Sequence, residues 1–312
     1  MTIIDAQVHI WPPETSERPY IKEDASKPHR PVNLGYEDLL REMSGAGVDR
    51  VVLVPPSWEG YRNDYALAAA QKFPDRFAVM GKVPLNDPAS KARIETWLQQ
   101  PGMLGFRISF RHSGTHSFLD DGTADWFWAD CERYDIPVMI FAPFAVAKIG
   151  AIAERHPGLR VIVDHMGLNT QWKGTDLAPG VDILLKFARL DNVGVKLSCL
   201  PCYVDEAYPY PALHPQIRRV VESFGPQRLF WGTDLSQLPC SYRQAVTLFT
   251  EELDFLTAQD KEWIMGRALA EWLHWPLTKP VRRTRRQARG KKSGLDDPRT
   301  IALGSIEKKE IP

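Results

Sequence analysis

The stretch "IIDAQVHIW" at residues 3–11 is a short apolar run in which Asp5, Gln7 and His9 occupy every second position. An alternation with this period is typical of a β-strand. The apolar residues between them are expected to pack against helices, which predicts that the three polar side chains share the opposite face. The strand would therefore carry Gln7 and His9 to whatever site lies at its carboxyl end.

Seven further runs rich in Val and Ile predict buried strands at 50–56, 76–85, 102–110, 136–143, 159–165, 192–198 and 228–234. Amphipathic stretches predict helices at 35–48, 65–76, 126–137, 146–158, 181–192, 214–227, 241–253 and 260–273. Eight strands alternating with helices indicate an α/β protein with a (β/α)8 TIM barrel, whose usual size is ~250 residues. A doubly wound open sheet is the rival fold. It normally has a glycine-rich loop after the first strand, and "HIWPPE" contains no glycine.

The 312 residues are predicted to form one barrel domain at 1–276, closed by an extra C-terminal helix, and a basic tail at 277–312. The tail holds 11 Lys and Arg against 4 Asp and Glu, although the whole chain has no net charge. Its low apolar content predicts disorder. Nucleic-acid binding is not expected, because nothing else in the chain supports it. A role in solubility or partner binding fits the tail better.

Four cysteines in a chain of this length do not suggest a disulfide framework, which favours a reducing compartment. We find no secretory signal, and no apolar run approaches the ~20 residues of a membrane helix. We therefore expect a cytoplasmic protein that binds a small-molecule substrate and no membrane. Because barrels of this kind often pair, a homo-oligomer is an open alternative.

Polar side chains at the carboxyl ends of the predicted strands indicate an active site, since barrel enzymes place their chemistry there. His165 and Asp234 end two of the runs and are expected to lie with His9 at the mouth of the barrel, the face formed by the carboxyl ends of the strands. Alternation in the run 102–110 brings Arg107, and Arg111 beyond it, to the same place. An inward cation needs an anionic partner, which for these arginines could be the substrate or the carboxylate of Asp5.

Two other features leave alternatives open. Lys196 also faces inward, and a structural ion pair is the favoured interpretation of this lysine. Residues 12–33 form a long loop after the first strand, on the active-site face. This loop is interpreted as a lid or as a plain surface insertion. Aromatic residues predicted near the mouth suggest a flat or apolar ligand, or they serve packing: Trp11, Trp58, Tyr61, Trp172 and Tyr203.

Four separated motifs, "IIDAQVHIW", "VIVDHMG", "GVKLS" and "LFWGTDLSQ", resemble the amidohydrolase superfamily in its amidohydrolase 2 branch. They occur in the family order along nearly the whole barrel, and "GRALAEWL" is similar to the family's closing helix. "VDHMG" most resembles the lactone hydrolase subgroup, which includes 2-pyrone-4,6-dicarboxylate lactonase and sugar-lactone hydrolases. The resemblance implies a barrel hydrolase.

The resemblance also implies where a metal would bind. Metal-dependent relatives hold a divalent ion with two histidines of strand 1, a histidine of strand 5 and the aspartate of strand 8. The matching positions here are Gln7, His9, a residue near Phe141 or Ala142, and Asp234. Catalytic zinc takes about three protein ligands. No cofactor is therefore expected. If a divalent metal such as zinc is bound, His9 and Asp234 are its ligands.

Some members of the lactone hydrolase subgroup work without metal. On that pattern we expect a metal-independent hydrolase of a lactone or related ester, with Asp234 as general base on water. His9 and His165 would polarise the carbonyl. Substrate-binding roles are expected for Gln7, Arg107 and Arg111. The pyrone lactonase places an arginine directly after "HMG", and Leu168 stands there in this chain, so a less charged lactone than a dicarboxylate is expected.

Two alternatives belong to other functional classes. One is a metal-dependent, non-oxidative decarboxylase of an aromatic or unsaturated carboxylic acid, which shares the barrel but needs its metal. The other is a catalytically silent barrel, which Gln7 favours and the retention of His9, His165 and Asp234 opposes. The metal content of the purified protein and a screen of lactones and aromatic acids would separate the three.

Overall fold

Eight parallel strands form one sheet in which each strand pairs with the next along the chain. The structure is a computed structural model that describes residues 1–21, 28–111, 113–169, 172 and 177–277. The strands are β1 (Ile4–Val8), β2 (Arg50–Leu53), β3 (Phe77–Gly81), β4 (Met103–Ser109), β5 (Val138–Phe141), β6 (Val161–Val163), β7 (Val193–Leu197) and β8 (Leu229–Trp231). Each lies inside one of the predicted runs, so the (β/α)8 barrel is confirmed.

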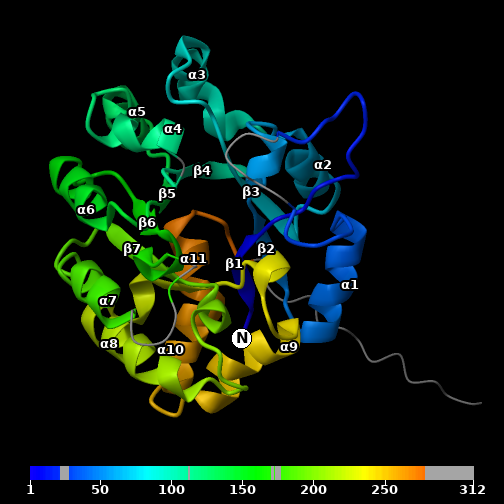
Figure 1. Cartoon of the computed structure of the whole chain (residues 1–312), viewed down its shortest axis with the longest axis vertical. Helices are drawn as coiled ribbons and strands as arrows, with labels where there is room; N and C mark the ends of the chain where they lie inside the picture. The colour runs from blue at the N-terminus through cyan, green and yellow to red at the C-terminus, as the bar shows by residue number, and fades with distance from the viewer. Residues whose placement is uncertain (22–27, 112, 170–171, 173–176, 278–312) are drawn as a thin grey trace, which may run out of the picture. The chain divides into compact units, whose positions relative to one another are not determined.

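Helices surround the strands as a ring (Figure 1). They are α1 (Tyr36–Ala46), α2 (Asp64–Lys72), α3 (Pro88–Ala92), α4 (Ser113–His116), α5 (Asp125–Arg133), α6 (Val146–Arg155), α7 (Leu177–Leu185), α8 (His214–Phe224), α9 (Tyr242–Thr247), α10 (Ala258–Glu262) and α11 (Ala268–Trp272). The sequence did not predict α3, a single turn that Asp87 caps by accepting a hydrogen bond from the Ala89 amide. The short helix α4 was not predicted either, and α7 ends seven residues before the end of the predicted stretch 181–192. The remaining helices overlap the predicted stretches.

The barrel has two apolar cores, one on each side of the strands. The larger core lies between strands and helices and takes one set of alternating strand residues, such as Val51 and Leu53 of β2. The smaller core fills the barrel interior with the other set, such as Met80, Met139 and Phe230. This two-sided burial explains why the strands read as continuous apolar runs.

The C-terminal helix α11 closes the floor of the barrel (orange in Figure 1). Its Leu269, and Leu273 just after it, belong to the interior core together with Ile4 of β1. Gly266, just before α11, lies so close to β1 that a Cβ there would stand 2.4 Å from the carbonyl oxygen of Thr2. The first and last segments of the domain are therefore packed directly against each other.

A β-bulge changes the predicted faces of β1. Asp5 and Val8 are three positions apart in the chain, whereas their partners in β2, Val51 and Leu53, are two positions apart. Ile4 and Ala6 consequently face the barrel interior, where they join the smaller core. The prediction that the polar trio shares one face is wrong for Asp5, which faces the helices. The extra residue of the bulge restores Gln7 to the interior.

Asp5 stabilises the seam between β1 and β8, the two ends of the strand order. Its carboxylate accepts hydrogen bonds from the Thr233 amide (2.9 Å), the Thr233 hydroxyl (2.5 Å) and the Tyr242 hydroxyl (2.8 Å). It also accepts the Gln7 amide at 3.0 Å, inside the bulge. The Asp234 amide donates to the Gln7 carbonyl oxygen at 2.9 Å and completes the seam. Burial raises the pKa of Asp5 to about 6, although these hydrogen bonds lower it.

No helix in the described ranges combines the length and apolar character needed to cross a membrane. The predicted basic tail lies outside the described residues, apart from Leu277. The loop 12–33 is described at 12–21 and 28–33, and neither part contains a helix or strand.

We predict that Asp5→Asn destabilises the fold by ~1–3 kcal/mol, because the amide nitrogen cannot accept hydrogen bonds and leaves buried donors unpaired. Urea unfolding at neutral pH measures this change. Asp75→Asn, at an exposed position, is the control and should leave the midpoint unchanged. Equal midpoints for the two variants would show that Asp5 does not stabilise the seam.

Candidate active site

Three residues predicted to be catalytic come together at the carboxyl ends of their strands. His9, His165 and Asp234 are each no more than 6% exposed. The Nε2 atom of His9 lies 3.2 Å from Asp234 Oδ1, and that of His165 lies 3.7 Å from Asp234 Oδ2. His9 follows β1, His165 follows β6 and Asp234 follows β8, so the two histidines and the carboxylate that they approach come from distant parts of the sequence.

Two of these residues have a left-handed backbone conformation, which directs their side chains into the mouth of the barrel. His165 has φ +54° and Asp234 has φ +55°, a region that residues other than glycine seldom adopt. Cys199, just beyond β7, has φ +60°. Three neighbouring strands thus end in the same strained conformation. Strain of this kind is concentrated at functional sites, where the surrounding packing maintains it.

Hydrogen bonds fix how the two imidazoles face the carboxylate. His9 Nδ1 lies 2.7 Å from the carbonyl oxygen of Val54, which can only accept, so Nδ1 carries the hydrogen and Nε2 faces Asp234. His165 Nδ1 lies 2.7 Å from the Ser198 hydroxyl. Burial lowers the pKa of His165 to about 4, so this ring is neutral at pH 7.

Asp234 is the ionised centre of the cluster. Burial opposes ionisation, but the neighbouring imidazoles of His9 and His165 hold the pKa of Asp234 well below its ordinary value. Its Oδ2 accepts a hydrogen bond from Gln237 Nε2. Its buried Oδ1 lies 3.2 Å from His9 Nε2 and has no other hydrogen-bond partner among the described residues. This oxygen can therefore accept one further donor, from a water molecule or a substrate.

Gln7 is oriented by a buried lysine. Lys196 Nζ donates to Gln7 Oε1 at 2.7 Å, and the amide nitrogen of Gln7 consequently faces His9 Nε2 at 3.5 Å. An ammonium group can only donate, so it determines which end of the amide points to the site. Gln7, which is fully buried, therefore presents a hydrogen-bond donor to His9.

Asp164 pairs with two cations. Its Oδ1 lies 2.8 Å from Lys196 Nζ, and its Oδ2 accepts from Arg107 Nε at 2.9 Å. Burial disfavours the ionised form, but Lys196 and Arg107 lower the pKa of Asp164 to about 2. The structural pair expected for Lys196 is confirmed. The suggestion that Asp5 pairs with Arg107 is wrong, because the β1 bulge turns Asp5 to the other side of the strand.

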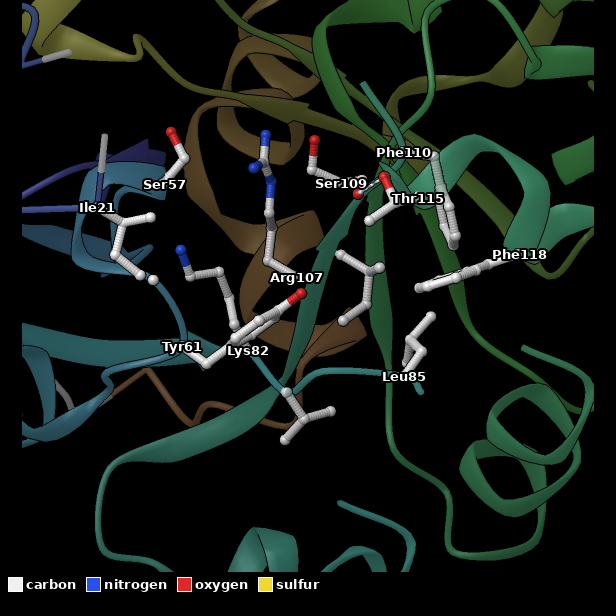
Figure 2. Close-up of a pocket in the computed structure, with 13 residues that line it drawn as sticks. Ile21, Ser57, Tyr61, Lys82, Leu85, Arg107, Ser109, Phe110, Thr115 and Phe118 are labelled. Atoms are coloured by element: carbon white, nitrogen blue, oxygen red, sulfur yellow. Dashed lines mark hydrogen bonds between the residues drawn. The ribbon is translucent and has the colours of Figure 1, made fainter. Parts of the chain in front are cut away.

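A small well of about 40 Å³ lies over these groups. Its walls include His9, His165, Asp234, Arg107, Arg111, Trp58 and Phe141. The sequence placed the two arginines at the mouth, and both line this well, although Arg111 is exposed. A neighbouring pocket of about 200 Å³ shares Ser57, Arg107 and Ser109 with the well (Figure 2).

His29 is a third histidine at the mouth that the sequence did not indicate. Its Nδ1 lies 2.8 Å from the Ser236 hydroxyl, and its ring centroid lies 5.8 Å from that of His9. Burial lowers the pKa of His29 to about 4. The residue belongs to the loop 12–33, which has no periodicity, so only the position of the loop on the active-site face could have indicated it.

The predicted aromatic residues divide between lining and packing. Trp58 lines the well and Tyr61 the larger pocket. Trp11 packs edge-on against Trp58 at 5.0 Å between ring centroids. Tyr203 is fully buried and donates to the carbonyl oxygen of His165 at 3.3 Å.

The donor set does not fit a tightly held metal ion. The oxygen of Gln7 is already bonded to an ammonium group, and Phe141, whose side chain cannot coordinate a metal, occupies the end of β5. No cluster of three His, Cys, Asp or Glu side chains suited to a metal occurs among the described residues. His9 and Asp234 alone fall short of the three protein ligands usual for catalytic zinc.

Comparisons with known proteins give one family and several relatives. Residues 4–273 match the family described as amidohydrolase. The chain is 28% identical to L-fucono-1,5-lactonase of Burkholderia ambifaria, over 74% of this chain and 79% of the relative. It is 26% identical to 4-sulfomuconolactone hydrolase of Hydrogenophaga intermedia, over 74% of this chain and 73% of the relative. A crystal structure of a Burkholderia multivorans amidohydrolase with bound zinc has a TM-score of 0.74 at 22% identity, covering 88% of this chain and all of the other.

We predict that Asp164→Asn lowers the free energy of unfolding by ~3–5 kcal/mol, because it leaves Lys196 and Arg107 buried without a counter-charge. Denaturant unfolding gives the value. Asp120→Asn, which breaks the exposed ion pair between Lys148 and Asp120, is the matched control and should cost less than ~1 kcal/mol. A similar loss in both variants would contradict a structural role for the buried pair.

Proposed function

Because the chain belongs to the amidohydrolase family, we propose that it hydrolyses a lactone or related ester. The observation that carries the proposal is the ionised Asp234, which lines a well between two imidazoles and whose Oδ1 has His9 Nε2 as its one polar partner among the described residues. The relatives named as L-fucono-1,5-lactonase and 4-sulfomuconolactone hydrolase support a lactone as the substrate class.

Asp234 acts as the general base in the proposed mechanism. Its Oδ1 takes a proton from water, and the water oxygen attacks the lactone carbonyl carbon to form a tetrahedral oxyanion. The ring C–O bond then breaks, and the leaving alkoxide receives the proton that Asp234 holds. Because Asp234 is ionised at neutral pH, the base needs no prior deprotonation.

Gln7 and His165 stabilise the oxyanion. The amide nitrogen of Gln7 is a donor because Lys196 holds its oxygen. If the Ser198 hydroxyl donates to His165 Nδ1, the neutral ring carries its hydrogen on Nε2, which faces the well. His9, whose Nδ1 donates to the Val54 carbonyl, keeps the carboxylate in place when its Nε2 also carries a hydrogen and donates to Asp234 Oδ1. Donors positioned in advance are effective here because the site excludes water.

Arg107 and Arg111 bind the substrate at the border between the well and the larger pocket. Only Nε of Arg107 is engaged within the described chain, by Asp164, so its two terminal nitrogens can reach a ligand. With the carbonyl in the well of about 40 Å³, the remainder of the substrate extends into the pocket of about 200 Å³.

Metal independence is part of the proposal. The buried ammonium of Lys196 supplies a fixed positive charge among Gln7, Asp164 and their neighbours, and it cannot share Gln7 Oε1 with a metal ion. The reaction therefore relies on hydrogen-bond donors to stabilise charge. A cytoplasmic location and a homo-oligomeric state stay predictions from the sequence.

Asp234→Asn is expected to keep the fold and to reduce kcat for lactone hydrolysis by ~10²–10⁴, because an amide cannot act as base. A panel of lactones assayed at neutral pH measures the loss, and circular dichroism checks the fold. Asp254→Asn, which is 90% exposed, is the control and should be fully active. A folded Asp234→Asn variant with full activity would rule out the mechanism.

Protein purified without added metal is expected to contain far less than one equivalent of zinc or manganese and to keep its activity after chelation. Elemental analysis and a chelator titration test this. Stoichiometric metal, with activity lost on chelation and restored by the ion, would contradict metal independence and favour the decarboxylase alternative if an aromatic acid were the substrate.

A further inference from the structure

The larger pocket contains a second buried cation that the mechanism does not use. Lys82 follows β3 directly, lines the pocket beside Arg107, and is 8% exposed. Figure 2 shows the charged ends of Lys82 and Arg107 toward Ser57, with Phe118 on the other side of the pocket. The pocket therefore has a cationic side and an apolar side.

Among the described residues, no acidic side chain accompanies Lys82 and Arg107 in the lining of this pocket. Asp164 is shared by Arg107 and Lys196, so one carboxylate serves two cations. The ammonium of Lys82 donates to the carbonyl oxygen of Pro56 at 2.7 Å, and it forms no ion pair within the described part of the chain. Glu59 attracts Lys82 from a distance, but its Oε2 is bonded to Arg18.

A buried cation without a counter-ion is costly. Burial, with a smaller contribution from Arg107, lowers the pKa of Lys82 to about 7, while Glu59 opposes the shift. An anion placed between Lys82 and Arg107 would offset this cost and gain charge-assisted hydrogen bonds. The apolar side of the pocket would cover the uncharged part of the same ligand.

We propose that Lys82 and Arg107 together bind an anionic group carried by the substrate, and that Lys82 determines specificity for it. The inference rests on the proposed lactone hydrolysis and narrows its substrate class to lactones with a carboxylate or similar anion. Ser57, Arg107 and Ser109 line both cavities. The anion therefore lies near the catalytic well and is a short substituent of the lactone ring.

The first test compares a γ-lactone bearing a ring carboxylate with the same lactone bearing a carboxamide. The wild-type protein is expected to prefer the carboxylate at least ~10-fold in kcat/KM, mainly through KM, since one ion pair of this kind is worth about a factor of ten. In Lys82→Met this preference should fall about tenfold. Lys72→Met, which removes an exposed lysine, should keep it.

An unchanged preference in a folded Lys82→Met variant would overturn the proposal. A wild-type protein that hydrolyses both lactones without preference would overturn it as well, and the proposed function would stand.

The second test measures binding without hydrolysis, by calorimetry with cyclopentanecarboxylate and cyclopentanecarboxamide. Tighter binding of the carboxylate, weakened in Lys82→Met, supports the anion site even if no lactone is hydrolysed, a result that would refute the proposed function alone. Equal affinity of the wild-type protein for both compounds overturns the anion site.

A pH titration of the wild-type protein covers the case in which Lys82→Met does not fold. Affinity for cyclopentanecarboxylate should decrease between about pH 6 and about pH 9, as Lys82 loses its proton in the presence of Arg107 and Glu59. Affinity for the carboxamide should not follow it. Parallel or flat profiles would overturn the proposal.

Discussion

The shared carboxylate of Asp164 is the interaction on which the site depends. It lies between Arg107 of β4 and Lys196 of β7, and all three charges are buried. Without it the two cations would repel each other inside the barrel. With it, Lys196 is held where it orients Gln7, and Arg107 keeps its terminal nitrogens for a ligand. One ion pair network thus sets the chemistry of the well on one side and the charge of the pocket on the other.

The same network bears on the expectation, drawn from the family resemblance, that Gln7 stands in place of a metal-binding histidine. The oxygen of Gln7 faces an ammonium group, which gives the amide a defined orientation. Replacing that ligand alone would leave an amide with no defined orientation. Gln7 and Lys196 form one unit, and Phe141 at the end of β5 is consistent with the same change. In the proposed mechanism the site relies on fixed donors and on the Asp234 carboxylate.

Sequence periodicity was sufficient to predict the barrel, because strands that are buried on both faces appear as clear apolar runs. It was also sufficient to predict the residues at the strand ends, because the carboxyl ends of parallel strands all lie on the same face of the barrel. His9, His165 and Asp234 were found this way. The local backbone conformation of β1 and the pairing of residues far apart in the chain could not be predicted from the sequence. The β1 bulge turned Asp5 away from the mouth, and the partner of Arg107 stood 57 residues away. Lys82 could have been found by the strand-end rule, whereas His29 lies in a loop without any period.

The floor of the barrel has a consequence for how the chain folds as it is synthesised. Ile4 and Ala6 of the first strand are covered by α11, near the end of the domain, and Gly266 touches the backbone of Thr2. The ribosome must therefore release residues up to about Trp275 before the earliest strand can be buried. Until then the nascent chain exposes apolar strand surface, which makes it prone to aggregation during translation.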